Sequence, residues 1–219
     1  MAGLTAMGDH RRMAFVRTSE PERTRGFSEG ACHLYVLPCA YEDLLKLGFS
    51  RQPLERMQAL HPRFFEFFDL DRALLVETET VRDARRLELE LRHALVEHSA
   101  PAPLTVRPQA AGHTEWYRGA YAVLEEAVGG LRERGHTVHA PLRPWLEAQM
   151  QSRAPSLFSW GSSVLERVEG EPDHLDRLPM LHALRQQVLD VIDAHRALGV
   201  DVAQHLPVTL EQWYARRGG

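Results

Sequence analysis

The stretch CHLYVLPCAYEDLLKLGFS, residues 32–50, decides which fold this chain is expected to adopt. It holds two short runs rich in apolar residues, HLYVL at 33–37 and LLKLGF at 44–49, on either side of a polar segment. Short β-branched and aromatic runs that flank a turn are typical of two antiparallel strands. The stretch therefore predicts a β-hairpin.

Within this hairpin stands an unusual residue, Lys46. It is the single lysine among the 26 lysines and arginines of the chain. An ammonium on a slim stem and a planar guanidinium fork are not interchangeable at a crowded site. Two interpretations stay open: the position requires an ammonium, or the lysine arose by drift.

Regular elements are also predicted after the hairpin. A helix is expected to begin near Pro53, and the alternation over residues 76–81 predicts a third strand. Thr80 and Asp83 have the spacing of a helix capping box. The helix that follows carries a stripe of residues at helical spacing, formed by Ala84, Leu87, Leu91, Leu95 and His98.

The second half of the chain is predicted to be mainly helical. Residues 114–135 are expected to contain a helix that is broken or weakened near Gly129–Gly130. Shorter elements are expected in the proline-punctuated segment that follows. A strong apolar stripe over 181–198 predicts a long helix, and Thr209 with Gln212 fits the cap of a final short one.

This order of elements predicts an α+β fold. A small domain would hold a short antiparallel or mixed three-stranded sheet flanked by helices, and a mainly helical C-terminal part would follow it. The predicted division is a flexible tail at 1–25, the sheet domain at 26–118 and the helical region at 119–219.

Composition excludes several classes of protein. A net charge of −4 argues against a chain whose main activity is tight, nonspecific DNA binding, so any nucleic acid would be held by a local arginine patch. No apolar run is long enough to span a membrane and no secretory signal is recognised, which favours a cytoplasmic location. Cys32 and Cys39 are expected to be free thiols.

Five stretches between residues 31 and 118 carry a family resemblance. They are HLYVL at 33–37, LLKLGFS at 44–50, PLERM at 53–57, DARRLELELRHAL at 83–95 and TEWY at 114–117. In this order they resemble the GIY-YIG nuclease superfamily, and particularly its T5 Orf172 and Mug113-like branch. The resemblance does not extend to residues 119–219.

The resemblance implies hydrolysis of DNA phosphodiester bonds with a single Mg²⁺ or Mn²⁺ ion. Glu88 matches the metal-binding glutamate of the family, Tyr35 the tyrosine near the attacking water, and Arg56 the family arginine. A magnesium ion that keeps several waters needs few protein ligands, so one carboxylate can hold it beside a phosphate. A guanidinium fork suits phosphate oxygens.

Each of these residues also has a purely structural interpretation. Glu88 would then be a helix-surface glutamate paired with Arg85 or Arg92. Tyr35 would simply pack its ring in a strand, and Arg56 would be a solvated helix arginine.

The chain departs from the family pattern at the second tyrosine, where Lys46 stands two residues before Gly48. A charged ammonium cannot accept a proton, which leaves phosphate neutralisation or tuning of Tyr35 as its role. The asparagine that some members use is missing as well, since the chain has none. His61 is a candidate for proton transfer or for a packed core histidine, and Glu115 matches the closing motif as a supporting or capping group.

Three hypotheses about function follow. The first is a metal-dependent DNA endonuclease of GIY-YIG type. The second is a module that kept the scaffold for binding nucleic acid or protein and lost the chemistry. The third places the function in the C-terminal region, where the 181–198 helix would pack within its own domain or join a second copy or a partner protein.

Overall fold

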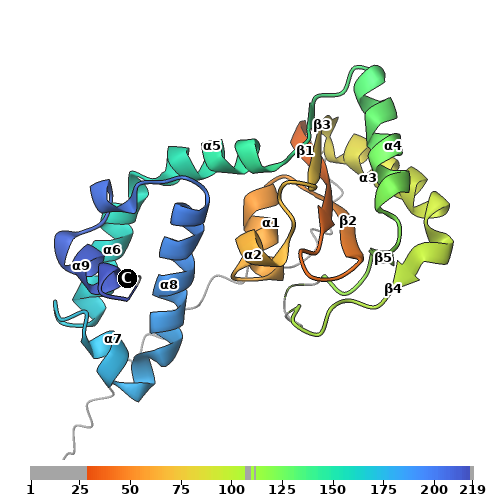
Figure 1. The fold of residues 1–219 in the computed structure, drawn as a ribbon. Coiled ribbons are helices and arrows are strands. Elements are labelled where there is room, and N and C mark those ends of the chain that lie inside the picture. Colours follow the sequence, from red (N-terminus) through yellow and green to blue (C-terminus); the bar gives the residue numbers. More distant parts are fainter. Residues whose placement is uncertain (1–28, 107–109, 111, 218–219) are drawn as a thin grey trace, which may run out of the picture.

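The computed structural model describes residues 29–106, 110 and 112–217, which form an α+β fold (Figure 1). The tail predicted at 1–25 lies outside the described residues. The strands are β1 (Glu29–Pro38), β2 (Leu44–Ser50), β3 (Leu74–Thr80), β4 (Ser99–Ala100), β5 (Trp116–Arg118) and β6 (Val138–His139).

Helices make up most of the remaining described residues. The α-helices are α1 (Pro53–Leu60), α2 (Phe64–Phe67), α3 (Val81–Ala94), α4 (Tyr121–Glu133), α5 (Arg143–Arg153), α6 (Ser156–Arg167), α7 (His174–Arg177), α8 (His182–Ala197) and α9 (Val208–Ala215). Short 3₁₀ segments are η1 (Val96–His98), η3 (Pro179–Leu181) and η4 (Val202–Gln204).

The strands of the described residues form one six-stranded sheet in the order β4-β5-β2-β1-β3-β6, with every neighbouring pair antiparallel. The hairpin predicted from residues 32–50 is confirmed as β1 and β2. In its register Tyr35 lies opposite Gly48, and Leu37 lies opposite Lys46. The strand predicted at 76–81 is β3, which pairs with the other side of β1.

The sheet has three strands more than the sequence predicted. The additional strands β4, β5 and β6 are only two or three residues long. So short a strand leaves no alternation for a sequence pattern to detect. The helix predicted within 114–135 begins at Tyr121, after β5 and the positive-φ turn at Gly119. It runs unbroken through Gly129–Gly130, because Leu124, Val128 and Leu131 anchor it on the sheet.

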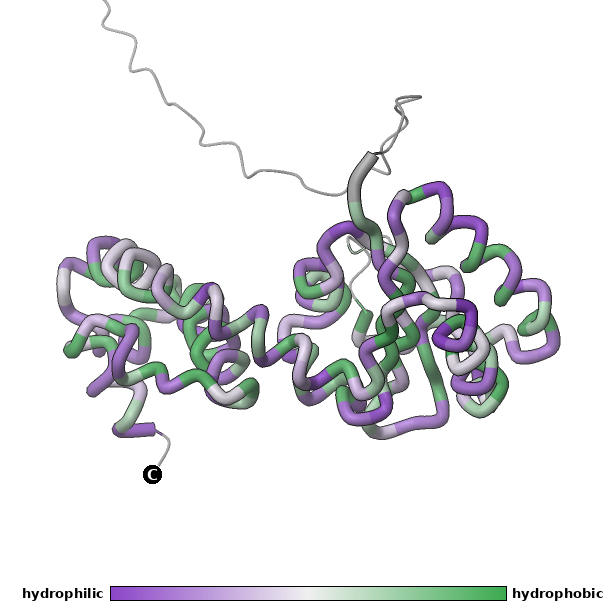
Figure 2. Tube along the Cα trace, turned by 90° about the horizontal axis from the view of Figure 1, so that it is seen from above, coloured by the Kyte–Doolittle hydropathy of each residue, from purple (hydrophilic) through white to green (hydrophobic). Residues whose placement is uncertain are grey.

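The two faces of β1 belong to two different cores. Leu34 and Val36 face a core that α3 and α4 cover, whereas Tyr35 and Leu37 face a core shared with α1 and α5. This alternation follows from the two-residue period of a strand. Figure 2 shows hydrophobic residues concentrated along the central strands, with mixed hydropathy along the helices.

The C-terminal helices form a second lobe. Figure 1 shows α6 to α9 gathered together on one side, with α5 leading to them from the sheet. We call residues 29–139 the sheet lobe and residues 156–217 the helical lobe, within the described ranges. The stripe predicted over 181–198 forms α8, and its residues Leu184, Val188 and Ile192 are buried.

The start of the last helix differs from the sequence prediction. The helix α9 begins at Val208, directly after Pro207, and no side chain caps it. Burial of Leu210 and Trp213 fixes its position, and the Trp213 indole donates a hydrogen bond to Asp176 at 3.0 Å. Packing therefore outweighs the capping signal read from Thr209.

The sheet-bearing part extends beyond the predicted boundary at residue 118, since α4 and β6 pack on or pair with the sheet. The division into domains stays a prediction. Within the described ranges, no helix combines the length and the apolar character needed to cross a membrane.

Arg63, just before α2, connects the two lobes. Its guanidinium lies 2.7 Å from Asp193 and 3.2 Å from Asp190 on α8, and 2.6 Å from Glu66. These carboxylates raise the pKa of Arg63 above its ordinary value through hydrogen bonds. A second pair, Arg153 with Glu55 at 2.6 Å, joins α5 to α1.

Replacing Arg63 with methionine should loosen the contact between the lobes. The apolar stem stays, but three neighbouring carboxylates lose their shared counterion, so we expect a loss of about 1 kcal/mol in the free energy of unfolding. Urea denaturation gives the energy, and small-angle scattering detects a change in lobe arrangement. Arg216→Met, which removes an exposed pair inside the helical lobe, is the control and should leave the scattering unchanged.

The two cysteines are free, as predicted, and both are buried. Burial raises the pKa of Cys32, and it raises the pKa of Cys39 to about 12. Because the thiolate is the reactive form, neither thiol should react with a disulfide reagent in the native protein near neutral pH, whereas both should react in denaturant. Rapid native labelling of Cys32 in β1, or of Cys39 just after it, would contradict the burial of these thiols.

Candidate active site

The candidate site is built around the hairpin, where the Tyr35 ring crosses over Gly48. A Cβ atom placed on Gly48 would lie 2.5 Å from the Tyr35 hydroxyl, which is too close for any side chain. Tyr35 is 3% exposed, and it points to the face covered by α1. The glycine of the second half-motif therefore makes room for the tyrosine of the first.

Arg56 on α1 faces the same hydroxyl. The helix begins at Pro53 and buries Leu54, Met57 and Leu60 against the sheet, which directs Arg56 toward Tyr35. Its Nε donates to the Tyr35 hydroxyl at 3.4 Å, and its Nη1 donates to the Ala110 carbonyl at 2.6 Å.

Tyr35 carries a neutral phenol near neutral pH. Burial raises the pKa of Tyr35 above its ordinary value, and the charge and hydrogen bond of Arg56 oppose this shift without cancelling it. A nearby cation by itself would favour the phenolate, but desolvation has the larger effect here.

Lys46 is buried at 2% exposure, and its ammonium is enclosed by protein acceptors. The Nζ donates to the Leu47 carbonyl at 2.9 Å, to the Thr114 carbonyl at 2.8 Å and to the Glu115 carboxylate at 3.4 Å. An ammonium has three N–H donors, so these acceptors can satisfy all of them. A contribution of Lys46 to phosphate neutralisation would therefore act through space.

The same enclosure lowers the pKa of Lys46 to about 8. Burial is the largest cause because it disfavours the charged form, and the Glu115 carboxylate opposes it. Arg56 adds to the lowering through charge repulsion.

Glu115 lies just before β5, with a positive φ of 57°. Its carboxylate lies 3.4 Å from Lys46 on one side and 3.4 Å from Arg92 of α3 on the other. The Thr114 hydroxyl also donates to it. Arg92 is thus a part of the site that sequence reasoning considered only as a partner for Glu88.

Glu88 lies on α3, whose N-terminus is capped by the Thr80 side chain as predicted. It is 8% exposed, yet none of the described residues donates a hydrogen bond to its carboxylate or forms an ion pair with it. The predicted pairing with Arg85 or Arg92 does not form, and Arg92 pairs with Glu115 instead. The residue as a whole is nearly buried, but its carboxylate oxygens keep contact with solvent.

The surroundings of Glu88 raise its pKa. Burial is the largest cause, and the charge of Glu115 adds to it, while Arg92 and Lys46 act in the opposite direction. Glu88 and Glu115 are therefore close enough to interact electrostatically, and Tyr35 feels both charges as well.

His61 lies past the end of α1, where its ring stacks on Phe67 at 4.5 Å. Its Nδ1 accepts a hydrogen bond from the backbone N–H of Arg63 at 3.2 Å. These contacts tie His61 to α2, and the residue is half-buried. Its role in proton transfer stays a prediction.

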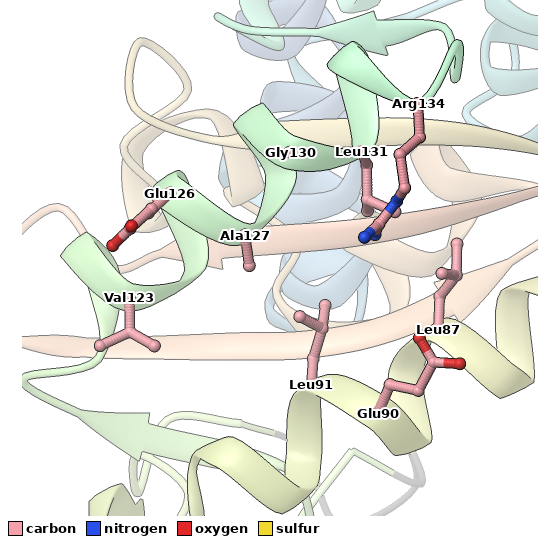
Figure 3. A pocket seen from close by; sticks show the side chains of 9 residues that line it. All are labelled: Leu87, Glu90, Leu91, Val123, Glu126, Ala127, Gly130, Leu131 and Arg134. Atoms are coloured by element: carbon pink, nitrogen blue, oxygen red, sulfur yellow. The ribbon is translucent and has the colours of Figure 1, made fainter.

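A groove between α3 and α4 lies apart from the candidate residues (Figure 3). Its lining includes Leu91, Val123 and Gly130, with Glu90 and Arg134 among its charged groups. It contains none of the candidate residues, so the cluster around Glu88 stands as a separate feature of the sheet lobe.

The donor set of the cluster limits which metal site is compatible with it. Across the described ranges, no group of three or more His, Cys, Asp or Glu side chains is arranged to hold a metal ion. A site for zinc would need such a group. Magnesium or manganese, which keep waters and need one or two carboxylates, fit the unpartnered Glu88.

The lowered pKa of Lys46 predicts how the free energy of unfolding changes with pH. Its folded-state pKa of about 8 lies below the ordinary 10.5, so between these values the unfolded state binds more protons and the free energy of unfolding rises with pH. Lys46→Met lacks this contribution. We expect wild-type stability to rise relative to that variant across this window, measured by urea denaturation; a constant difference would mean that the ammonium is not buried.

Comparison with known proteins agrees with these motifs. Residues 33–132 match the family model of the T5orf172 domain, a span that runs from β1 into α4 and includes Tyr35, Lys46, Arg56, Glu88 and Glu115. No curated protein and no solved structure matches the chain. The matched span is thus similar to the T5orf172 domain, contains all five sequence stretches, and extends past residue 118, where the predicted resemblance ended.

Proposed function

We propose that the T5orf172 domain is a metal-dependent endonuclease of GIY-YIG type that hydrolyses phosphodiester bonds in DNA. The observation that supports this most is Glu88, a residue only 8% exposed whose carboxylate reaches solvent and has no hydrogen-bond or ion-pair partner among the described residues. It shares a site with a tyrosine, a lysine and two arginines. Such a group of residues suits a reaction on a phosphate.

Glu88 would hold a single Mg²⁺ or Mn²⁺ ion. Bound there, the ion would supply positive charge for the phosphate and would lower the pKa of water. The unfavourable burial of the Glu88 charge supports this assignment, because a cation would relieve it.

Tyr35 and Arg56 would act on the attacking water and the reacting phosphate. The neutral phenol of Tyr35 would orient water through its hydroxyl, because a phenol with a raised pKa stays protonated near neutral pH and has almost no phenolate to accept a proton. Arg56 would hold that hydroxyl and add positive charge to the site. Lys46 would contribute its charge through space.

A second function from another class is a binding module without catalysis. It is favoured by Lys46, which replaces the second tyrosine of the motif and donates to three protein acceptors. Such a module would bind nucleic acid with an affinity that falls steeply with salt.

The helical lobe would contribute substrate or partner specificity. Its longest helix, α8, buries one face within the lobe and contacts Arg63, just before α2, through Asp190 and Asp193. A second copy of the chain or a partner protein that binds residues 181–198 would contact the face of α8 that this packing leaves exposed.

Glu88→Gln tests the metal assignment with almost no change in shape. We expect nicking of supercoiled plasmid in Mg²⁺ or Mn²⁺ to fall at least about 100-fold, because several kcal/mol of charge stabilisation are lost. Glu90→Gln is the matched control, since Glu90 is an exposed glutamate of the same helix.

Three results would decide between the two functions. Equal nicking by wild type and Glu88→Gln would reject Glu88 as the metal ligand. Salt-dependent DNA binding by wild type, without nicking in either metal, would replace the nuclease by the binding module. Nicking that only Glu88→Gln loses would support the nuclease.

A further inference from the structure

The backbone of Glu115 is strained, with φ at 57°. A residue with a side chain in this region costs on the order of 1–3 kcal/mol, and it persists only where the surroundings hold it. Glycine would adopt this conformation without strain. The presence of a glutamate here therefore points to a use for its side chain.

Contacts from β2 hold this strained residue from two sides. The Leu47 N–H donates to the Glu115 carbonyl at 3.1 Å. The Lys46 ammonium bonds the carbonyl of Thr114 and the carboxylate of Glu115. One strand thus fixes both the backbone and the side chain of the same residue.

Arg92 holds the carboxylate from the opposite side. Lys46 contacts Oε2 and Arg92 contacts Oε1, each at 3.4 Å. Arg92 lies four residues after Glu88 on α3, one helical turn along the same face. The Glu115 carboxylate is thereby brought to the part of α3 that carries the unpartnered Glu88.

We propose that Glu115 is a second carboxylate of the divalent-cation site, beside Glu88, and that Lys46 and Arg92 are positioning residues that aim it. This rests on the proposed function, which assigns the cation to Glu88. The ligand class is a hard divalent cation with oxygen ligands, Mg²⁺ or Mn²⁺, for which two carboxylates and waters are suitable ligands.

Lys46 and Arg92, as positioning residues, should strengthen cation binding, whereas ordinary positive charges near a cation site weaken it. Removing a positive charge near a cation site strengthens cation binding by simple electrostatics. If the two residues aim Glu115, their removal misplaces a ligand and weakens binding. The sign of the change therefore separates positioning from charge alone.

Mn²⁺ binding to the full chain, measured by the free-ion electron paramagnetic resonance signal, tests this without relying on cleavage. We expect Glu88→Gln and Glu115→Gln each to weaken the Kd at least about tenfold. Lys46→Met and Arg92→Met should also weaken it. Glu90→Gln should bind as wild type, and circular dichroism verifies that each variant is folded.

The outcomes separate this inference from the proposed function. Normal Mn²⁺ affinity in Glu115→Gln, with loss in Glu88→Gln, would overturn the second carboxylate and leave the metal assignment of Glu88 intact. Tighter Mn²⁺ binding by Lys46→Met and Arg92→Met would show that Lys46 and Arg92 act only as nearby positive charges and do not position Glu115. Arg92 is 42% exposed, so its variant should fold even if Lys46→Met does not. Wild type that binds Mn²⁺ without nicking DNA would contradict only the nuclease activity.

Discussion

The Lys46 ammonium is buried, so the surrounding residues must supply acceptors for its three N–H donors. A buried charge is tolerated only when its donors are paired, and this one has three acceptors within 3.4 Å. Two of them belong to residues 114 and 115, almost seventy positions further along the chain. The lysine therefore joins the first hairpin to the segment that becomes β5, and it fixes where Glu115 lies.

The other parts of the site follow from this join. Glu115 lies against α3 because Lys46 holds one of its oxygens and Arg92 holds the other. Arg92 pairs with Glu115 and not with Glu88, so Arg92 and Arg85 of the same helix act on the Glu88 charge only at longer range.

The drift interpretation of Lys46 does not account for these contacts. Arginine at this position would bring a wider, planar group into a space bounded by two carbonyls and a carboxylate, whereas an ammonium directs three donors from one compact atom. Tyrosine, the residue of the family motif, would offer one donor in place of three. The lysine is therefore explained by the acceptors around it, in a chain that otherwise uses arginine for positive charge.

The sequence by itself determined the parts that depend on neighbours along the chain. The hairpin, α1 after Pro53, the Thr80 cap of α3 and the α8 stripe can all be predicted, because turn residues, caps and periodicity act over a few positions. The motif residues Tyr35, Gly48, Arg56 and Glu88 were also visible there as a pattern. Only the tertiary structure decided the rest. The short strands β5 and β6 pair with the longer β2 and β3, β4 pairs with β5, and none of the three leaves a periodic signal. The acceptors of Lys46, the strained φ of Glu115 and the lack of a partner for Glu88 depend on contacts between distant segments, since burial and pairing are properties of the packed chain.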